Sequence, residues 1–330
     1  MLYCICIIPI ILYLFLIKGM DGFSLASVPK IAESFLWGMI CCVSLFFAGM
    51  HFSLETVWLG PLLEELMKAL PLVFAIYRKR TAFFAETLIY GAAIGAGFAL
   101  PENILYINLS SDFLLGDAIV RGFGTSLLHM GCTALCGSCL LLGSRYVVNS
   151  PPALKPVSIA GGFAIPFLIH FLYNLFLLPE LVQMIITVAL LFGLFVLIYA
   201  FDNSRIHEWL DLCINNDMIL LKSMREGQLS ATAAGTYLVA TRDRFKPEVF
   251  FDICVYLGLY LEMSIAAKSR MILKEAEMDV PFPEETHKAN LDKLAELHAL
   301  EKNIGVSGLS VLRPIIDAKA MDKWVLDSLL

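Results

Sequence analysis

Long apolar runs separated by short polar loops fill the first two thirds of the chain. A helix of about 20 predominantly apolar residues spans the hydrocarbon core of a bilayer, and seven runs are near that length. After residue 202 the apolar positions recur at mixed spacings of three and four, which is typical of amphipathic helices. The pattern predicts an all-α protein, a polytopic membrane helix bundle with a C-terminal all-α soluble domain. The expected spans are residues 2–17, 35–53, 56–77, 82–107, 117–142, 157–178 and 180–201.

The density of charge divides the chain at the same point. Charged side chains are sparse through residue 201 and frequent from residue 202 onward. We therefore expect a transmembrane domain at 1–201 and a cytoplasmic helical domain at 202–330. The second domain either docks substrate, senses a signal or gates the site, or it mediates self-association, and the sequence leaves both readings open. Its expected helices are residues 204–225, 227–241, 247–277, 284–303 and 307–329.

Basic residues indicate how the spans are oriented. Lys and Arg gather in every second loop, most clearly at Arg78-Lys79-Arg80, while the intervening loops carry almost none. Because positive loops face the cytoplasm, the N-terminus is expected outside and the C-terminal domain in the cytoplasm. We expect an integral, multi-pass membrane protein. The net charge of −6 argues against a nucleic-acid partner.

The third span carries three charges near its middle. An ionised side chain at that depth costs roughly 2.5–3.5 kcal/mol on insertion scales. At 100° per residue, Glu64 and Lys68 lie about 40° apart on the helix, and Glu65 lies on the other side of Lys68. The three charges share one face, so this face is expected to look into a polar cavity or onto polar partners.

Three later spans supply such partners. The fourth carries Glu102 and Asn103, the fifth carries His129, and the sixth carries His170 and Asn174 at a spacing of four. Polar groups in an apolar medium are costly unless they are hydrogen-bonded. We therefore expect these side chains to meet the charges of the third span inside the bundle.

Spacing along the fourth and fifth spans suggests where one helix packs closely and where one charge lies. Gly91, Gly95 and Ala99 form a small-residue stripe on the fourth span, which lets a neighbouring helix approach closely. On the fifth span, Arg121 precedes His129 by eight residues. We expect Arg121 near the outer interface, where an arginine reaches water at little cost.

Taken in order, these motifs resemble the PrsW family of intramembrane proteases. The similarity covers roughly residues 56–178, and it is most specific in the Gly95–Tyr106 block, which reads Gly-x-Gly-Phe-Ala-x-x-Glu-Asn-Ile-Leu-Tyr. The last motif, His170-x-x-x-Asn174, also resembles the wider superfamily of CAAX prenyl endopeptidases and Abi-type proteins. In that superfamily the first motif is Glu-Glu-x-x-x-Arg, whereas here Lys68 comes one residue earlier, as in PrsW.

The resemblance implies hydrolysis of a peptide bond in a cavity open to the membrane. Glu64 is expected to be the general base and Glu65 to assist it. His129 would orient the water, and His170 and Asn174 would donate to the oxyanion. The expected supporting residues are Lys68, Glu102 and Asn103.

The resemblance leaves two versions of the chemistry open. The prenyl endopeptidases favour a glutamate mechanism without a cofactor, and no His-Glu-x-x-His motif is present. The alternative is a zinc site at His129, His170 and Glu64 with an open position for water. We favour the metal-free version, with zinc as the alternative.

The expected location, a bacterial cytoplasmic membrane, and the expected substrate also come from the resemblance. It implies a membrane-anchored protein, such as an anti-sigma-type regulator, that is cut near its membrane segment. A lipidated peptide is less favoured because the first motif departs from the prenyl endopeptidase form. The competing class is a non-proteolytic membrane protein whose buried polar network serves packing or solute and proton passage.

Overall fold

The described chain is helical, in agreement with the predicted fold class. The computed structural model contains no strand among the residues it describes. These residues form two compact units, Met1–Asn203 and Ser204–Leu330. The structure describes residues 1–23, 25–52, 57–78, 80–81, 83–144, 154–278 and 283–316.

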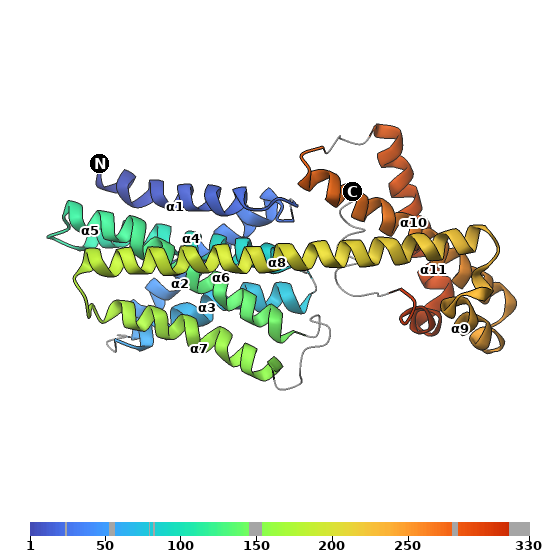
Figure 1. The fold of residues 1–330 in the computed structure, drawn as a ribbon. Coiled ribbons are helices and arrows are strands. Elements are labelled where there is room, and N and C mark those ends of the chain that lie inside the picture. The colour runs from blue at the N-terminus through green and yellow to red at the C-terminus, as the bar shows by residue number, and fades with distance from the viewer. Residues whose placement is uncertain are drawn as a thin grey trace. The chain divides into compact units, whose positions relative to one another are not determined.

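The first unit is a bundle of long helices that run along a common direction (Figure 1). Each predicted span corresponds to a helix, and the bounds differ by up to about seven residues except at the end of the seventh span. The fifth span consists of α5 and α6 joined by a π-helical turn, η1, of residues Val120–Thr125. The remaining bounds are α1 (Leu2–Gly19), α2 (Val28–Phe52), α3 (Leu59–Tyr77), α4 (Phe84–Leu109), α5 (Leu115–Ile119), α6 (Ser126–Gly143), α7 (Leu154–Asn174) and α8 (Glu180–Arg225).

Seven helices of the described chain are long and apolar enough to cross a membrane, judged by length and composition. Six of them correspond to predicted spans. The third predicted span, α3, does not meet this criterion, but it packs against α2, α6 and α7 within the first unit. The remaining helix of this length and composition is α10 (Pro247–Glu275). The sequence predicts that α10 belongs to the soluble domain, and this stays a prediction.

One predicted boundary is wrong. The sequence predicts separate helices at 180–201 and 204–225, but α8 runs from Glu180 to Arg225 without a break. The charged residue at the expected break, Asp202, is 3% exposed and accepts a hydrogen bond from the backbone N–H of Ala85 at 2.6 Å. This N–H belongs to the first turn of α4, where it lacks a partner within its own helix. Asp202 therefore joins two helices of the first unit instead of ending one.

The buried centre of the first unit is α4, which packs against α1, α2 and α6. Its small-residue stripe is at the closest approach. A Cβ added to Gly91 would lie 2.7 Å from the Cα of Ala134, and one added to Gly95 would clash with the backbone carbonyl of His129. The absence of side chains at these two positions therefore lets α6 lie directly on α4. This contact brings His129 to the face of α4 that carries Glu102.

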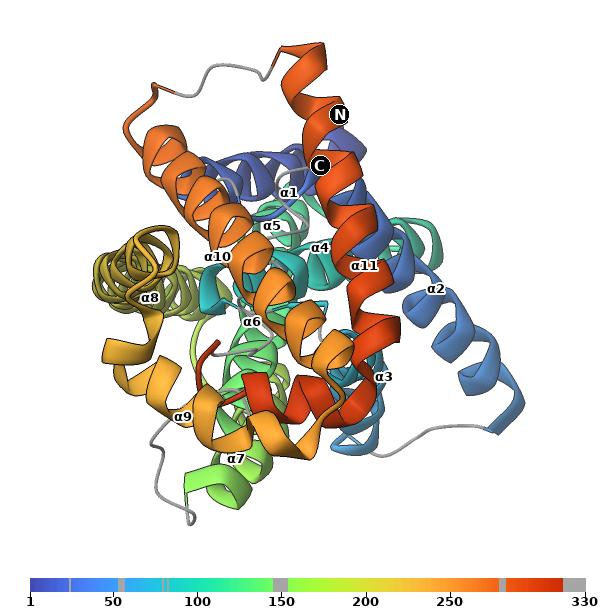
Figure 2. The ribbon, with the colours of Figure 1, turned by 90° about the vertical axis from the view of Figure 1, so that its right-hand side faces the viewer.

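The second unit contains the C-terminal helices (Figure 2). Its largest contact joins α10 and α11 (Glu284–Leu312), and α9 (Ala233–Thr241) precedes them. The predicted helix 284–303 continues in α11 through Gly305, whose φ of 62° introduces a kink. The break expected after residue 303 is therefore a kink within one helix. The predicted helix 307–329 extends beyond residue 316, and that part lies outside the described residues.

Candidate active site

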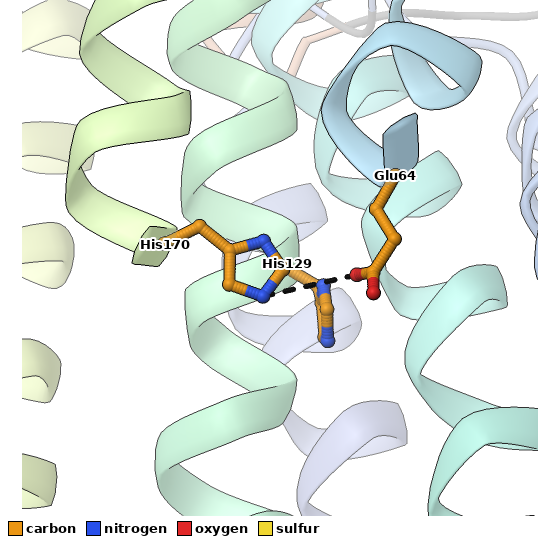
Figure 3. Close-up of side chains that lie close together, drawn as sticks. All are labelled: Glu64, His129 and His170. Carbon is orange, nitrogen blue, oxygen red and sulfur yellow. Dashed lines mark ion pairs between the residues drawn. The ribbon is translucent and has the colours of Figure 1, made fainter. Parts of the chain in front are cut away.

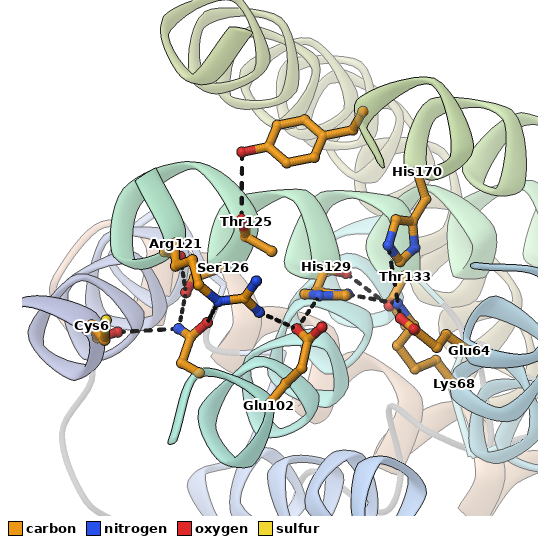
Figure 4. Close-up of polar contacts among 12 residues, drawn as sticks. Cys6, Glu64, Lys68, Glu102, Arg121, Thr125, Ser126, His129, Thr133 and His170 are labelled. Atoms are coloured by element: carbon orange, nitrogen blue, oxygen red, sulfur yellow. Dashed lines mark hydrogen bonds and ion pairs between the residues drawn. The ribbon is translucent and has the colours of Figure 1, made fainter. Parts of the chain in front are cut away.

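Polar side chains of α3, α4, α6 and α7 meet inside the first unit, as the sequence predicts (Figure 4). Most of them are almost completely buried. Lys68 and His129 are 0% exposed, His170 is 2% exposed, and Glu65 is 4% exposed. So many buried ionisable groups are tolerated only if they form hydrogen bonds or ion pairs with one another.

Glu65 is the carboxylate that connects α3 with α7. Lys68, one turn further along α3, donates to its Oε1 at 2.6 Å. The Nδ1 of His170 lies 2.8 Å from the same oxygen. His170 therefore presents its other nitrogen, Nε2, to the rest of the cluster. A histidine that binds a metal or transfers a proton through one ring nitrogen is commonly oriented by a carboxylate that accepts a hydrogen bond from the other.

His129 is bound from both sides. Its Nδ1 lies 3.0 Å from Lys68 Nζ, and its Nε2 lies 2.8 Å from Glu102 Oε2. An ammonium group can only donate, so Nδ1 is the acceptor and Nε2 carries the hydrogen that is donated to Glu102. The ring also lies edge-on to His170, with ring centroids 5.0 Å apart. These contacts fix both the orientation and the tautomer of His129.

Glu64 and Glu102 are the partly accessible carboxylates of the cluster, with side chains 20% and 17% exposed. The Oε2 atom of Glu64 is itself buried and has no hydrogen-bond partner. This oxygen faces His170 Nε2 at 3.7 Å. Glu64 and Glu102 also line a pocket of about 340 Å³ between α2, α3 and α4. Its other lining residues are mostly apolar: Cys42, Leu45, Phe46, Gly60, Leu63, Phe98, Leu105, Tyr106 and Leu109.

Glu64, His129 and His170 form a possible metal-binding group (Figure 3). Each offers one ligand atom, and the three atoms lie within 4.8 Å of one another. Two histidines and one glutamate are a donor set that catalytic zinc sites use. Two atoms fit this role: Oε2 of Glu64, which has no hydrogen-bond partner, and Nε2 of His170, the ring nitrogen that does not contact Glu65. His129 would first have to release either Lys68 or Glu102, because both of its nitrogens are occupied.

The structure brings together most of the predicted site residues. Asn103 is fully buried one contact away from the histidines, where its amide donates to Ser126 Oγ at 3.0 Å. Asn174, the last residue of α7, is half-buried, and its side chain makes no hydrogen bond within the described part of the chain. The residues that meet in the cluster are Glu64, Glu65, Lys68, Glu102, His129 and His170.

Arg121 also belongs to the cluster, and the sequence analysis did not include it among the site residues. The sequence predicts that Arg121 lies near the outer interface, but its side chain is 15% exposed and forms an ion pair with Glu102 at 3.0 Å. Its spacing from Thr125 and His129 along the fifth span was the available signal. The π-helical turn that rotates Arg121 toward Glu102 leaves no mark in the pattern of apolar positions.

Comparison with known proteins gives two matches. The family whose model matches residues 27–201 is described as the PrsW family of intramembrane metalloproteases. Protease PrsW of Bacillus subtilis (strain 168) is 27% identical over 171 residues, which cover 48% of this chain and 73% of that protein. No solved structure matches the chain. The matched residues include every member of the cluster.

Proposed function

Because the chain belongs to the PrsW family of intramembrane metalloproteases, we propose that it hydrolyses a peptide bond of a membrane-anchored protein at this cluster. One observation carries the proposal. Glu64 is accessible from a pocket, has an unpartnered carboxylate oxygen and lies beside two oriented histidines. A cluster that served only packing would have no need for a carboxylate that lines a pocket and keeps a buried oxygen without a partner.

Glu64 is the proposed reactive carboxylate: it is the general base in the metal-free version, and it would be a ligand if a metal is bound. The 3.7 Å between its Oε2 and His170 Nε2 is too long for a direct hydrogen bond, so as a base this oxygen is left to accept a proton from a water that enters through the pocket. Glu65 holds His170 through Nδ1 and assists in this way without contacting the water. Asn174 lies one helical turn beyond His170, and its amide is the proposed donor to the oxyanion.

A divalent metal at Glu64, His129 and His170 is the first candidate for the chemical type. The description of the family and the donor set both support it. Such an ion, when bound, supplies a Lewis acid and increases the acidity of water. The chain would contribute Glu65 and Glu102 as the carboxylates that orient the two histidines.

The metal-free glutamate mechanism is the second candidate, and one contact favours it. Lys68 Nζ lies 3.0 Å from the acceptor nitrogen of His129, so a cation of the chain already occupies that lone pair. In this version Lys68 supplies the positive charge of the site, and Glu64 alone activates the water.

Metal analysis of the purified protein separates the two versions. The first candidate predicts about one zinc or other divalent ion per chain, and it predicts that a Glu64→Gln, His170→Gln double variant loses the ion. The second candidate predicts neither a stoichiometric ion nor a loss of cleavage after treatment with a chelator.

The protease proposal itself is tested with Glu64→Gln, which keeps the size of the side chain and removes the base. Loss of a general base typically lowers the rate by about 10²–10⁴-fold. Comparative membrane proteomics should show one precursor that accumulates in the Glu64→Gln strain. The matched control is Glu33→Gln, an exposed glutamate on α2. Unchanged cleavage in the Glu64→Gln strain, at normal protein level, would assign the cluster to packing or to solute and proton passage.

The pocket supports the proposed substrate class. Its lining is mostly apolar and includes Leu45, Leu63 and Leu105, which suits side chains of a membrane segment. We propose a membrane-anchored protein of the anti-sigma regulator type. The proposed orientation has the N-terminus outside, and the proposed second domain is cytoplasmic and acts in substrate docking, regulation or self-association.

A further inference from the structure

We infer that Arg121 is a positioning residue for His129 and that it acts through Glu102. This inference rests on the proposed function, because it concerns the site at which the peptide bond would be cleaved. It adds a residue from outside the acidic and histidine motifs of the chain.

The π-helical turn brings Arg121 onto the face of His129. In a regular α-helix, residues eight positions apart are offset by about 80° around the axis. A π-helical turn accommodates one additional residue, which reduces this offset to roughly 20°. Here the turn covers Val120–Thr125, between the two residues. The carbonyl of Arg121 accepts hydrogen bonds from both the N–H and the Oγ of Ser126, the first residue of α6.

The guanidinium group of Arg121 is held on three sides. Its Nη2 is 3.0 Å from Glu102 Oε2, and its Nε donates to Asn103 Oδ1 at 3.1 Å. The planar group also stacks on Tyr106, 3.6 Å from the ring centroid. An arginine can make the ion pair, the hydrogen bond and the stacking contact at once because its guanidinium group is rigid and planar. A lysine would supply the charge from a single point only.

Arg121 and His129 share a single oxygen atom. Glu102 Oε2 accepts from His129 Nε2 at 2.8 Å and forms the ion pair with Arg121 at 3.0 Å. The carboxylate is therefore fixed between the two, and it selects the tautomer in which Nδ1 of His129 has its lone pair free for a partner. Without Arg121, a carboxylate that lines the pocket would lose its cation, and both Glu102 and His129 would lose their fixed orientation.

The test compares Arg121→Gln and Arg121→Lys with the wild type. The matched control is Arg225→Gln, which removes an exposed arginine that pairs with Glu262. Cleavage kinetics are measured in reconstituted membranes, and the ¹⁵N signals of His129 are measured on histidine-labelled protein, with a His129→Gln variant for assignment. We expect kcat to fall about 10–100-fold in Arg121→Gln, with KM changed by less than about threefold. Arg121→Lys should recover part of the loss, and the His129 signals should move in both Arg121 variants and remain unchanged in the control.

Each outcome bears on the inference. Unmoved His129 signals in Arg121→Lys, together with wild-type kcat, would overturn it. If Arg121→Gln does not fold, as judged by its thermal transition, Arg121→Lys and the NMR readout decide. If the wild type and Glu64→Gln show the same absence of cleavage, the proposed function fails, while the His129 signals still report whether Arg121 holds the ring.

Discussion

Each buried histidine of the cluster is held by a carboxylate, and each of these carboxylates is paired with a cation. The arrangement gives two short chains of contacts, which the 3.0 Å contact between Lys68 and His129 joins. In both, the cation compensates a carboxylate that would otherwise be costly in an apolar bundle. The accessible Glu64 is the carboxylate without such a cation in contact, and this distinguishes the proposed base from its neighbours. The two chains are Lys68–Glu65–His170 and Arg121–Glu102–His129.

Lys68→Met tests the buried pair with Glu65. The substitution leaves the Glu65 carboxylate, which is 4% exposed, without its cation. We expect the free energy of unfolding to fall by roughly 3–5 kcal/mol, the usual effect of removing one partner of a buried pair. The double variant Lys68→Met, Glu65→Gln should be less destabilised, because neither charge remains. Denaturant unfolding in detergent micelles measures both values.

The control for this prediction is Lys222→Met. Lys222 and Glu226 form an exposed pair at 3.8 Å, with 75% and 48% of the side chains accessible. Exposed pairs contribute about 0–1 kcal/mol. If Lys68→Met were no more destabilising than Lys222→Met, the assignment of Lys68 as the compensating cation would be wrong.

At the scale of helices, the sequence predicts most of what the structure contains. Seven apolar runs predict the long helices described in the first unit, where α5, η1 and α6 together make up the fifth run, because a bilayer requires a minimum length. The small-residue stripe with Gly91 and Gly95 correctly indicates a close contact. The long α8 and the position of Arg121 were not predicted. Asp202 appears as a charged boundary until its partner on α4 is known, and a π-helical turn depends on tertiary contacts that no local pattern reveals.

Gly95→Ala tests whether the contact between α4 and α6 builds the site. The added Cβ would clash with the backbone of His129, which cannot move without shifting α6. Overpacking of this kind costs about 1–3 kcal/mol, and we expect cleavage to fall along with stability because His129 moves away from Glu102. The matched control is Gly193→Ala on α8, where a Cβ meets open space. A Gly95→Ala protein with wild-type stability and cleavage would contradict this account of the packing.

At the scale of the whole molecule, the site and the C-terminal helices belong to different units. Every residue of the cluster lies in Met1–Asn203, and the family match ends at residue 201. A chain that ends after Arg225 retains all of α8, including Asp202, which caps α4. We expect this truncated protein to cleave a short membrane-segment peptide with kcat within about threefold of the full chain, because general acid–base chemistry depends on the groups that touch the reacting atoms. Cleavage of the natural precursor, assayed side by side in vesicles, should fall if the second unit docks substrate. Loss of cleavage of the short peptide by a truncated protein with an intact thermal transition would show that the C-terminal helices are needed for the chemistry itself.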